Sequence, residues 1–180
     1  PHPNAVLEAA APLVGALVDA RAPELVDHVL MHGGQLDTIQ AAFLGAVLID
    51  NSVYEELANP LRPEHFFVPA HRLIMDRFLT MLERGATASP VTLKPYFESD
   101  EALKQLGGTT YLAQLTADGQ GLLHPRELAD QIYDLALLRK LVSVGRTLVE
   151  GALDTSDEVE PLRKIEQAEA DLCSEGVSHG

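Results

Sequence analysis

A single helical pattern runs without a break from Pro125 to about Leu153, and no other feature of the sequence limits the fold as strongly. The pattern follows the turn signal Gly119-Gln120-Gly121 and ends at Asp154-Thr155-Ser156-Asp157. A second helical pattern then runs from about Val159 to Cys173. Because so short a connection places consecutive helices side by side, residues 121–175 are predicted to form an antiparallel helical hairpin.

The long helix carries more apolar side chains than one partner helix can cover. At about 100° per residue they fall into two stripes on nearly opposite sides. The first stripe consists of Leu128, Ile132, Leu135, Leu138, Val142 and Val149, and the second stripe consists of Tyr133, Leu137, Leu141, Val144 and Leu148. The returning helix offers only Leu162, Ile165, Ala168 and Leu172 as apolar positions for covering a stripe. The hairpin alone therefore leaves one stripe without a cover.

We predict that the second stripe is the uncovered one and that it is buried between chains. Two-fold pairing of hairpins would bury it symmetrically, because both copies then contribute the same surface. The basic residues Arg139, Lys140 and Arg146 would remain on the outer surface for partners. A competing interpretation is that the globular part of the chain, or helices at its N-terminus, fold back onto the second stripe within one molecule.

The composition of the whole chain favours an all-α protein. Apolar residues make up 46% of the sequence while aromatic residues make up 5%, and there is no Trp. A core of Leu, Val, Ile and Ala is typical of packed helices rather than of a β-sandwich. We therefore expect a globular helical bundle over residues 37–120, followed by the hairpin.

Local signals place the boundaries of this bundle. Asp37-Thr38-Ile39-Gln40 has the spacing of a capping box and is predicted to open its first helix. Pro69 should begin a helix that runs towards Gly85, and Gly107-Gly108 should separate two short helices. The two flanking segments are a helical N-terminal extension of unassigned role, residues 1–36, and the start of a linker or tail, residues 176–180.

The stretch RPEHFFVPAHRLIMDRF, residues 62–78, concentrates rigid and aromatic residues where a plain connector would suffice. We predict that Phe66 and Phe67 anchor this turn in the core, with His65 and His71 at its solvated rim. An acid–base role for the two histidines is the alternative, but no Ser, Cys or Asp completes a nucleophile arrangement with them. His28 and His32 share a helix spacing without a third metal ligand. No catalytic, cofactor or metal site is predicted.

Charge and motif content point away from several classes of function. The net charge is −14, which repels the phosphate backbone, so weak or no direct nucleic-acid binding is expected. None of the four lysines follows a glycine, so the sequence contains no phosphate-binding P-loop. Cys173 is the single cysteine, as is common in a reducing compartment, and no apolar run reaches membrane-spanning length. We expect a soluble, cytoplasmic protein.

Several segments, in order, resemble the N-terminal domain of the DnaB-like replicative helicases over about residues 38–175. The most specific are the Leu44-Gly45-Ala46 helix, the turn from Pro63-Glu64-His65-Phe66 to Pro69-Ala70-His71-Arg72, Val91-Thr92-Leu93, and Gly107-Gly108 before Tyr111-Leu112. The resemblance implies a helical globule with a hairpin, a dimer or hexameric ring collar, and docking of primase. It also implies a RecA-like C-terminal domain that holds ATP and Mg²⁺, and it allows a helicase loader as a further partner.

The sequence is therefore interpreted as the non-catalytic N-terminal oligomerisation and primase-interaction domain of a replicative DNA helicase, an ATP-dependent enzyme when complete. The alternatives are the helicase-binding domain of a primase, whose fold is similar, and another helical protein-interaction module. The helicase and primase interpretations differ in what is expected after residue 180, which is a linker helix and an ATPase core in the helicase and nothing in the primase. One departure from the family pattern is the run of more than thirty residues that precedes the Leu44-Gly45 helix.

Overall fold

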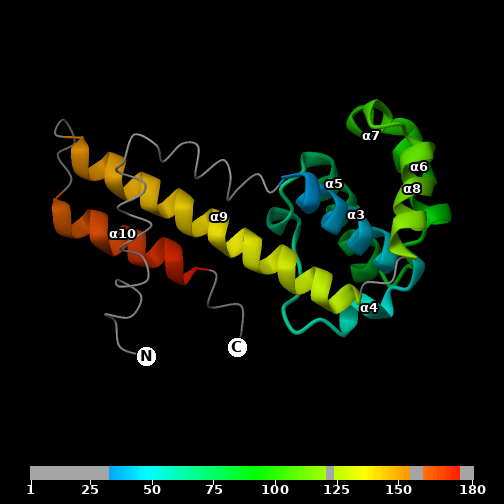
Figure 1. The fold of residues 1–180 in the computed structure, drawn as a ribbon, viewed down its shortest axis with the longest axis horizontal. Helices are drawn as coiled ribbons and strands as arrows, with labels where there is room; N and C mark the ends of the chain where they lie inside the picture. The colour runs from blue at the N-terminus through cyan, green and yellow to red at the C-terminus, as the bar shows by residue number, and fades with distance from the viewer. Residues whose placement is uncertain (1–32, 121–123, 155–159, 175–180) are drawn as a thin grey trace. The chain divides into compact units, whose positions relative to one another are not determined.

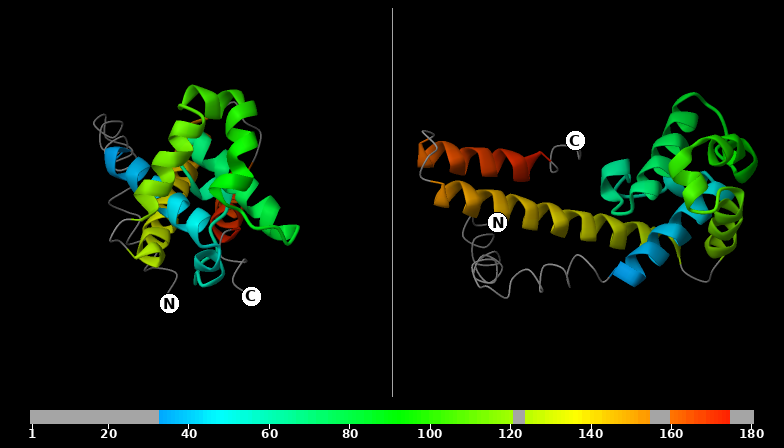
Figure 2. Two further views of the ribbon diagram at one scale, coloured as in Figure 1. Left: turned by 90° about the vertical axis from the view of Figure 1, so that its right-hand side faces the viewer. Right: turned by 90° about the horizontal axis from the view of Figure 1, so that it is seen from above.

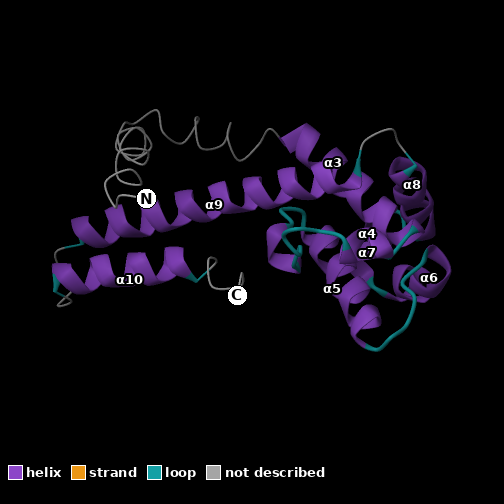
Figure 3. Ribbon diagram, turned by 90° about the horizontal axis from the view of Figure 1, so that it is seen from below, coloured by secondary structure: helices purple, strands orange, loops and turns teal. Residues whose placement is uncertain are grey.

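The computed structural model of the chain describes residues 33–120, 124–154 and 160–174. All regular elements in these ranges are helices and none is a strand, so the all-α prediction is confirmed (Figures 1 and 3). The chain divides into two compact units. One unit, the bundle unit, spans His32–Ala136, and the second includes the hairpin residues Leu137–Gly180. The first turns of the long helix belong to the bundle unit and its remainder belongs to the hairpin.

The elements follow one another with short connections. They are α3 (Gly33–Ile49), α4 (Ser52–Glu55), a 3-10 turn η1 (Pro63–His65), α5 (Pro69–Glu83), α6 (Pro90–Ser99), α7 (Glu101–Gln105), α8 (Thr109–Gly119), α9 (Pro125–Leu153) and α10 (Pro161–Cys173). The predicted start of α5 at Pro69 and the break at Gly107-Gly108 are both confirmed. The bounds of α9 also agree with the sequence pattern.

Helix α3 starts earlier than its sequence signals predict. It includes Gly33 and Gly34, so the capping box proposed at Asp37 lies inside the helix and does not open it, and that prediction was wrong. Two helical glycines cost about 1 kcal/mol each. That cost is small beside the burial that follows, because seven of the nine residues from Gln40 to Leu48 are apolar and α3 is buried there on nearly all sides.

The bundle unit is organised by a backbone-to-backbone crossing of α3 and α8, which contact each other more extensively than any other pair of described helices (Figure 2). At Gly45 an added Cβ atom would lie 1.8 Å from the carbonyl oxygen of Leu115. An added Cβ at Gly119 would lie 2.2 Å from the carbonyl carbon of Gly45. Neither position has room for any side chain, so the crossing depends on both glycines.

The remaining helices complete one apolar core around this crossing. Four phenylalanines are fully buried, and they come from α3, the η1 turn, α5 and α6: Phe43, Phe66, Phe78 and Phe97. Helix α9 contributes Leu128, Ala129 and Ile132 from its first turns to the same cluster. Its first turn is also tied to α4 by an ion pair between Arg126 and Glu56.

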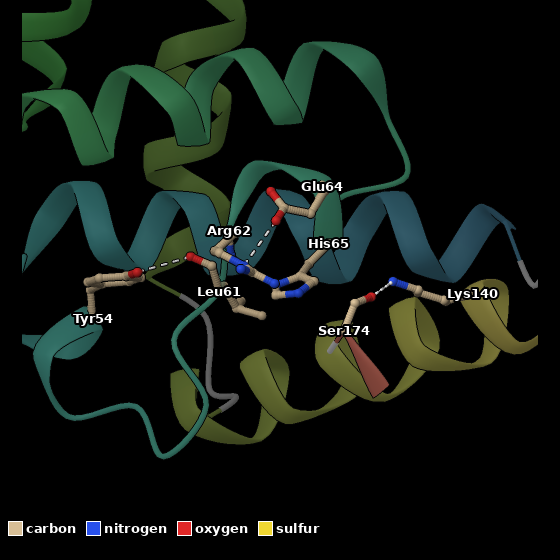
Figure 4. A network of polar contacts seen from close by, with 7 residues as sticks. All are labelled: Tyr54, Leu61, Arg62, Glu64, His65, Lys140 and Ser174. Carbon is tan, nitrogen blue, oxygen red and sulfur yellow. Dashed lines mark hydrogen bonds and ion pairs between the residues drawn. The ribbon is translucent and has the colours of Figure 1, made fainter. Parts of the chain in front are cut away.

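The turn before α5 is fixed by backbone carbonyls that accept side-chain donors. Tyr54 Oη donates to the carbonyl oxygen of Leu61 at 3.0 Å (Figure 4). Arg72 Nε donates to the carbonyl oxygen of Phe66 at 2.6 Å. The Phe66 ring lies 6.3 Å from the Phe43 ring, centroid to centroid. Phe66 is buried in the core as predicted, whereas Phe67 is only partly covered. The density of rigid residues in this stretch therefore has a packing role.

The crossing predicts a sharp difference between two glycine substitutions. Gly45→Ala should lower the free energy of unfolding by about 3 kcal/mol or more, because the new methyl group would overlap a backbone carbonyl that cannot rotate away. Gly151→Ala is the matched control, since a Cβ there would only touch Lys164 Cδ at 3.8 Å. It should leave stability unchanged or raise it by up to about 1 kcal/mol through helix propensity. Urea titration followed by circular dichroism measures both, and equal stability of the two variants would contradict the packing described.

Candidate interaction surface and the buried histidines

The two histidines of the 62–78 stretch are buried, so the prediction that they line a solvated rim was wrong. His71 Nδ1 lies 2.9 Å from Gln40 Oε1, and His71 Nε2 is hydrogen-bonded to Tyr111 Oη. Because an amide oxygen only accepts, Nδ1 carries the proton and Nε2 accepts the hydroxyl hydrogen of Tyr111. The three side chains join α3, α5 and α8 through one polar network.

Burial keeps this network neutral. It lowers the pKa of His71 from 6.5 to about 4, since the charged imidazolium would lose its hydration. Burial also raises the pKa of Tyr111 to about 12, with smaller contributions from the negative charges of Asp37 and Asp118. Near neutral pH both groups stay uncharged and keep the hydrogen-bond pattern that the three helices share.

His65 has a separate structural role. Its Nδ1 accepts a hydrogen bond of 2.9 Å from the backbone N–H of Arg62, which closes the η1 turn (Figure 4). Its ring meets the Tyr133 ring edge to face, with the centroids 5.3 Å apart. Both histidines are therefore engaged in packing, and neither faces a nucleophile. Among the described residues, no group of His, Cys, Asp and Glu is placed to bind a metal ion, and His28 and His32 lie outside the described residues.

The hairpin unit brings α9 and α10 side by side along the second stripe (Figures 1 and 2). Between them runs a groove of about 320 Å³, lined on α9 by Val144, Thr147, Leu148 and Gly151 and on α10 by Arg163, Lys164, Gln167, Ala168 and Asp171. Lys164 Nζ donates to the carbonyl oxygen of Gly151 at 2.5 Å. Lys140 Nζ donates to Ser174 Oγ at 2.8 Å (Figure 4). The returning helix therefore approaches α9 mainly through polar side chains.

The residues of the predicted interface do not share one surface in this arrangement. Tyr133 packs on His65 inside the bundle unit, and Leu137 and Leu141 are half-buried. Val144 and Leu148 border the groove with α10. Since the structure contains one chain, burial of the second stripe between chains remains a prediction. Within the chain, α10 already lies over part of that stripe.

The basic residues proposed for partners are also separated. Lys140 is turned towards α10 through its bond to Ser174. Arg139 is half-buried and Arg146 is exposed, and their spacing of seven residues puts both on one side of α9. Arg139 and Arg146 therefore lie on one side of α9, and Lys140 is hydrogen-bonded to Ser174 beyond the end of α10.

Both helices of the hairpin expose large apolar side chains, which are Leu138, Leu148 and Leu153 on α9 and Leu162, Ile165 and Leu172 on α10. We call Leu162, Ile165 and Leu172 the α10 apolar face; Leu162 is 62% exposed and Ile165 is 51% exposed. The helical spacing had identified these residues as the apolar side of the returning helix, and that side was expected to cover a stripe of α9. Of the four apolar positions, only Ala168 lines the groove. The signal that could have identified the face is the polar opposite side, where Lys164, Gln167 and Asp171 recur at the same helical spacing.

The sequence of the chain is similar to known proteins of one family. The sequence model of the DnaB-like helicase N-terminal domain matches residues 36–134. A replicative DNA helicase DnaB of Rickettsia conorii is 38% identical over 138 residues, which cover 75% of this chain and 28% of that protein. A replicative DNA helicase DnaB of Rickettsia typhi is 35% identical over the same shares. The chain thus spans little more than a quarter of these relatives.

The fold is similar to a solved structure as well. The crystal structure of the N-terminal domain of DnaB helicase from Mycobacterium tuberculosis has a TM-score of 0.67 and 25% sequence identity, covering 76% of this chain and 95% of that one. None of the helices that the structure describes combines the length and the hydropathy needed to cross a bilayer.

The buried network predicts a specific dependence of stability on pH. The pKa of His71 is about 4 in the folded chain and 6.5 when exposed, so the unfolded state binds a proton first as the pH falls. His71 therefore adds no penalty above about pH 7.5, and between there and pH 4 it removes about 3 kcal/mol of stability. Unfolding measured at several pH values should show His71→Gln losing this part of the slope. His124→Gln, at an exposed position, is the control and should keep it; identical slopes in all three proteins would contradict the assignment.

Proposed function

The chain belongs to the DnaB-like helicase N-terminal domain family, and we propose that it is the non-catalytic oligomerisation and primase-interaction domain of a replicative DNA helicase. ATP-driven unwinding, with its ATP and Mg²⁺, is assigned to a part of the full-length cytoplasmic protein outside this chain. The observation that carries the proposal is the α10 apolar face. A hairpin whose returning helix leaves large apolar side chains in water is suited to associate with another protein surface.

A second copy of this chain is the partner that the apolar residues favour. Full burial of one leucine or isoleucine contributes about 1.5–3 kcal/mol. The three residues of the α10 apolar face are already partly covered, so each adds about 1 kcal/mol and a two-fold pair gains about 6 kcal/mol. Association costs about 4–15 kcal/mol in lost freedom of motion. A stable assembly therefore needs further contacts, which Leu137 and Leu141 of the second stripe or closure of a ring of copies would provide.

Primase is the proposed second partner, and a helicase loader is a further one. The basic residues proposed for this contact are Arg139, Lys140 and Arg146 of α9, of which Lys140 also donates a hydrogen bond to Ser174 Oγ within the hairpin. These residues lie on a chain with a net charge of −14. An acidic domain that presents local basic residues selects partners by charge, since like-charged surfaces repel and the basic residues attract an acidic patch. The same net charge disfavours direct binding of DNA.

Self-association is tested by charging the α10 apolar face. Leu162→Glu combined with Ile165→Glu should weaken association about 100-fold or more, because two apolar contacts are lost and two carboxylates would have to be buried. Both positions are exposed in the single chain, so the helix content should stay the same. Sedimentation equilibrium measures the mass, and circular dichroism measures the helicity.

Val91→Glu is the control for replacing an exposed apolar residue by a carboxylate, because Val91 is 81% exposed and lies on α6 of the bundle unit. This variant should associate like the unchanged chain. Wild-type mass in the α10 double variant with normal helicity would rule out the hairpin as the interface. A wild-type chain that is monomeric at all concentrations would rule out self-association of this domain.

A further inference from the structure

Helix α10 is held against α9 with little apolar burial of its own. None of the α10 residues, all of which the structure describes, is buried. Its side chains Leu162 and Ile165 are more than half exposed, and the apolar residue that it places in the groove against α9 is the small Ala168. Burial of an apolar face supplies most of the stability of a helix in a folded protein. Polar contacts must therefore contribute much of the attachment of α10.

Two lysine side chains connect the helices, and each reaches the C-terminal end of the other helix. Lys164 of α10 donates from Nζ to the carbonyl oxygen of Gly151 at 2.5 Å, in the last turn of α9. Lys140 of α9 donates from Nζ to Ser174 Oγ at 2.8 Å (Figure 4). Ser174 is the C-terminal cap of α10, and its hydroxyl donates in turn to the carbonyl oxygen of Asp171 at 2.8 Å.

The charges at the helix ends explain why lysines occupy these positions. The C-terminal end of a helix carries a partial negative charge, and a lysine placed there can bond the last carbonyl groups and offset that charge. Neither α9 nor α10, both described over their whole length, has a basic residue in its own last turn. Glu150 and Asp171 add acidic side chains near the two ends. The positive charge that each end lacks comes from the opposite helix.

We propose that Lys140 and Lys164 form a pair of latches, and that α10 separates from α9 when their charges are removed or screened. The latched helix lies over Val144 and Leu148 of the second stripe, with the groove of about 320 Å³ between the two helices. Release would uncover these two side chains while the bundle unit stays folded. Ionic strength would then regulate the hairpin. The proposal concerns a single chain and does not rest on self-association or on primase binding.

Lysine-to-methionine substitutions test the latches in the full 180-residue chain. Methionine has a similar helix propensity and an unbranched stem, but it carries no charge and donates no hydrogen bond. Lys140→Met combined with Lys164→Met should accelerate amide hydrogen exchange in residues 161–173 at least about tenfold, because a detached helix of this length is only marginally stable. Exchange in α3 and α8 should stay the same. Unchanged exchange in residues 161–173 would overturn the proposal.

The single variant Lys140→Met distinguishes a latch from a local effect within α10. It alters α9 alone, so the faster exchange expected in residues 161–173 has to be transmitted across the helix pair. Lys94→Met is the control, because Lys94 lies on α6 and pairs with Glu98 of the same helix. This control should leave exchange in α10 unchanged. If Lys140→Met has no more effect on α10 than Lys94→Met, the two helices are not latched through Lys140.

Salt tests the dependence on charge without any substitution. Raising NaCl from about 0.1 M to about 1 M shortens the screening length from about 10 Å to about 3 Å. Exchange in residues 161–173 of the unaltered chain should accelerate, and this salt dependence should be lost in the double methionine variant. Equal salt dependence in both proteins would contradict the latches. All samples are compared at a dilution where sedimentation gives one mass for every variant, so failure of the proposed self-association is distinguishable from failure of the latches.

Discussion

The close contact between the backbones of α3 and α8 is the constraint on which the rest of the bundle unit depends. It exists because Gly45 and Gly119 leave no side chain between the two helices. Once the helices touch, apolar residues on both sides of the crossing are buried together, and α5, α6 and the first turns of α9 complete the core. The hairpin begins within the same helix that completes this core, since α9 continues unbroken from Ile132 into residues 137–153.

Buried polar groups then select one arrangement of these helices. The Gln40–His71–Tyr111 network joins three helices, and its bonds require a neutral imidazole with the proton on Nδ1. Asn51 has a similar role at the end of α3, where its side-chain amide bonds the carbonyl oxygens of Val47 and Ala88 and the N–H of Ala88. Such groups add little net free energy, but misplacing them would leave buried donors unpaired at about 1–3 kcal/mol each.

The sequence predicted those features that depend on neighbouring residues. Pro69 sets the start of α5, Gly107-Gly108 separates α7 from α8, and the periodicity of α9 gives its bounds, because each signal acts within a few residues. The start of α3 was missed since burial of its apolar residues outweighs the local preference of two glycines. His71 was misplaced because its partners Gln40 and Tyr111 lie 31 and 40 residues away. The exposed face of α10 was missed for the same reason, as long-range bonds such as Lys164 to Gly151 decide which side meets α9.

We propose that the bundle unit is a stable support and that the hairpin carries the association surface. Amide hydrogen exchange of the unaltered chain, measured over a range of protein concentrations, tests this most directly. We predict that protection of residues 160–174 rises with concentration, because association covers Leu162, Ile165 and Leu172 and suppresses local opening of α10. Protection of α3 and α8 should be high and independent of concentration. Protection that rises in the bundle unit and stays constant in α10 would contradict the account.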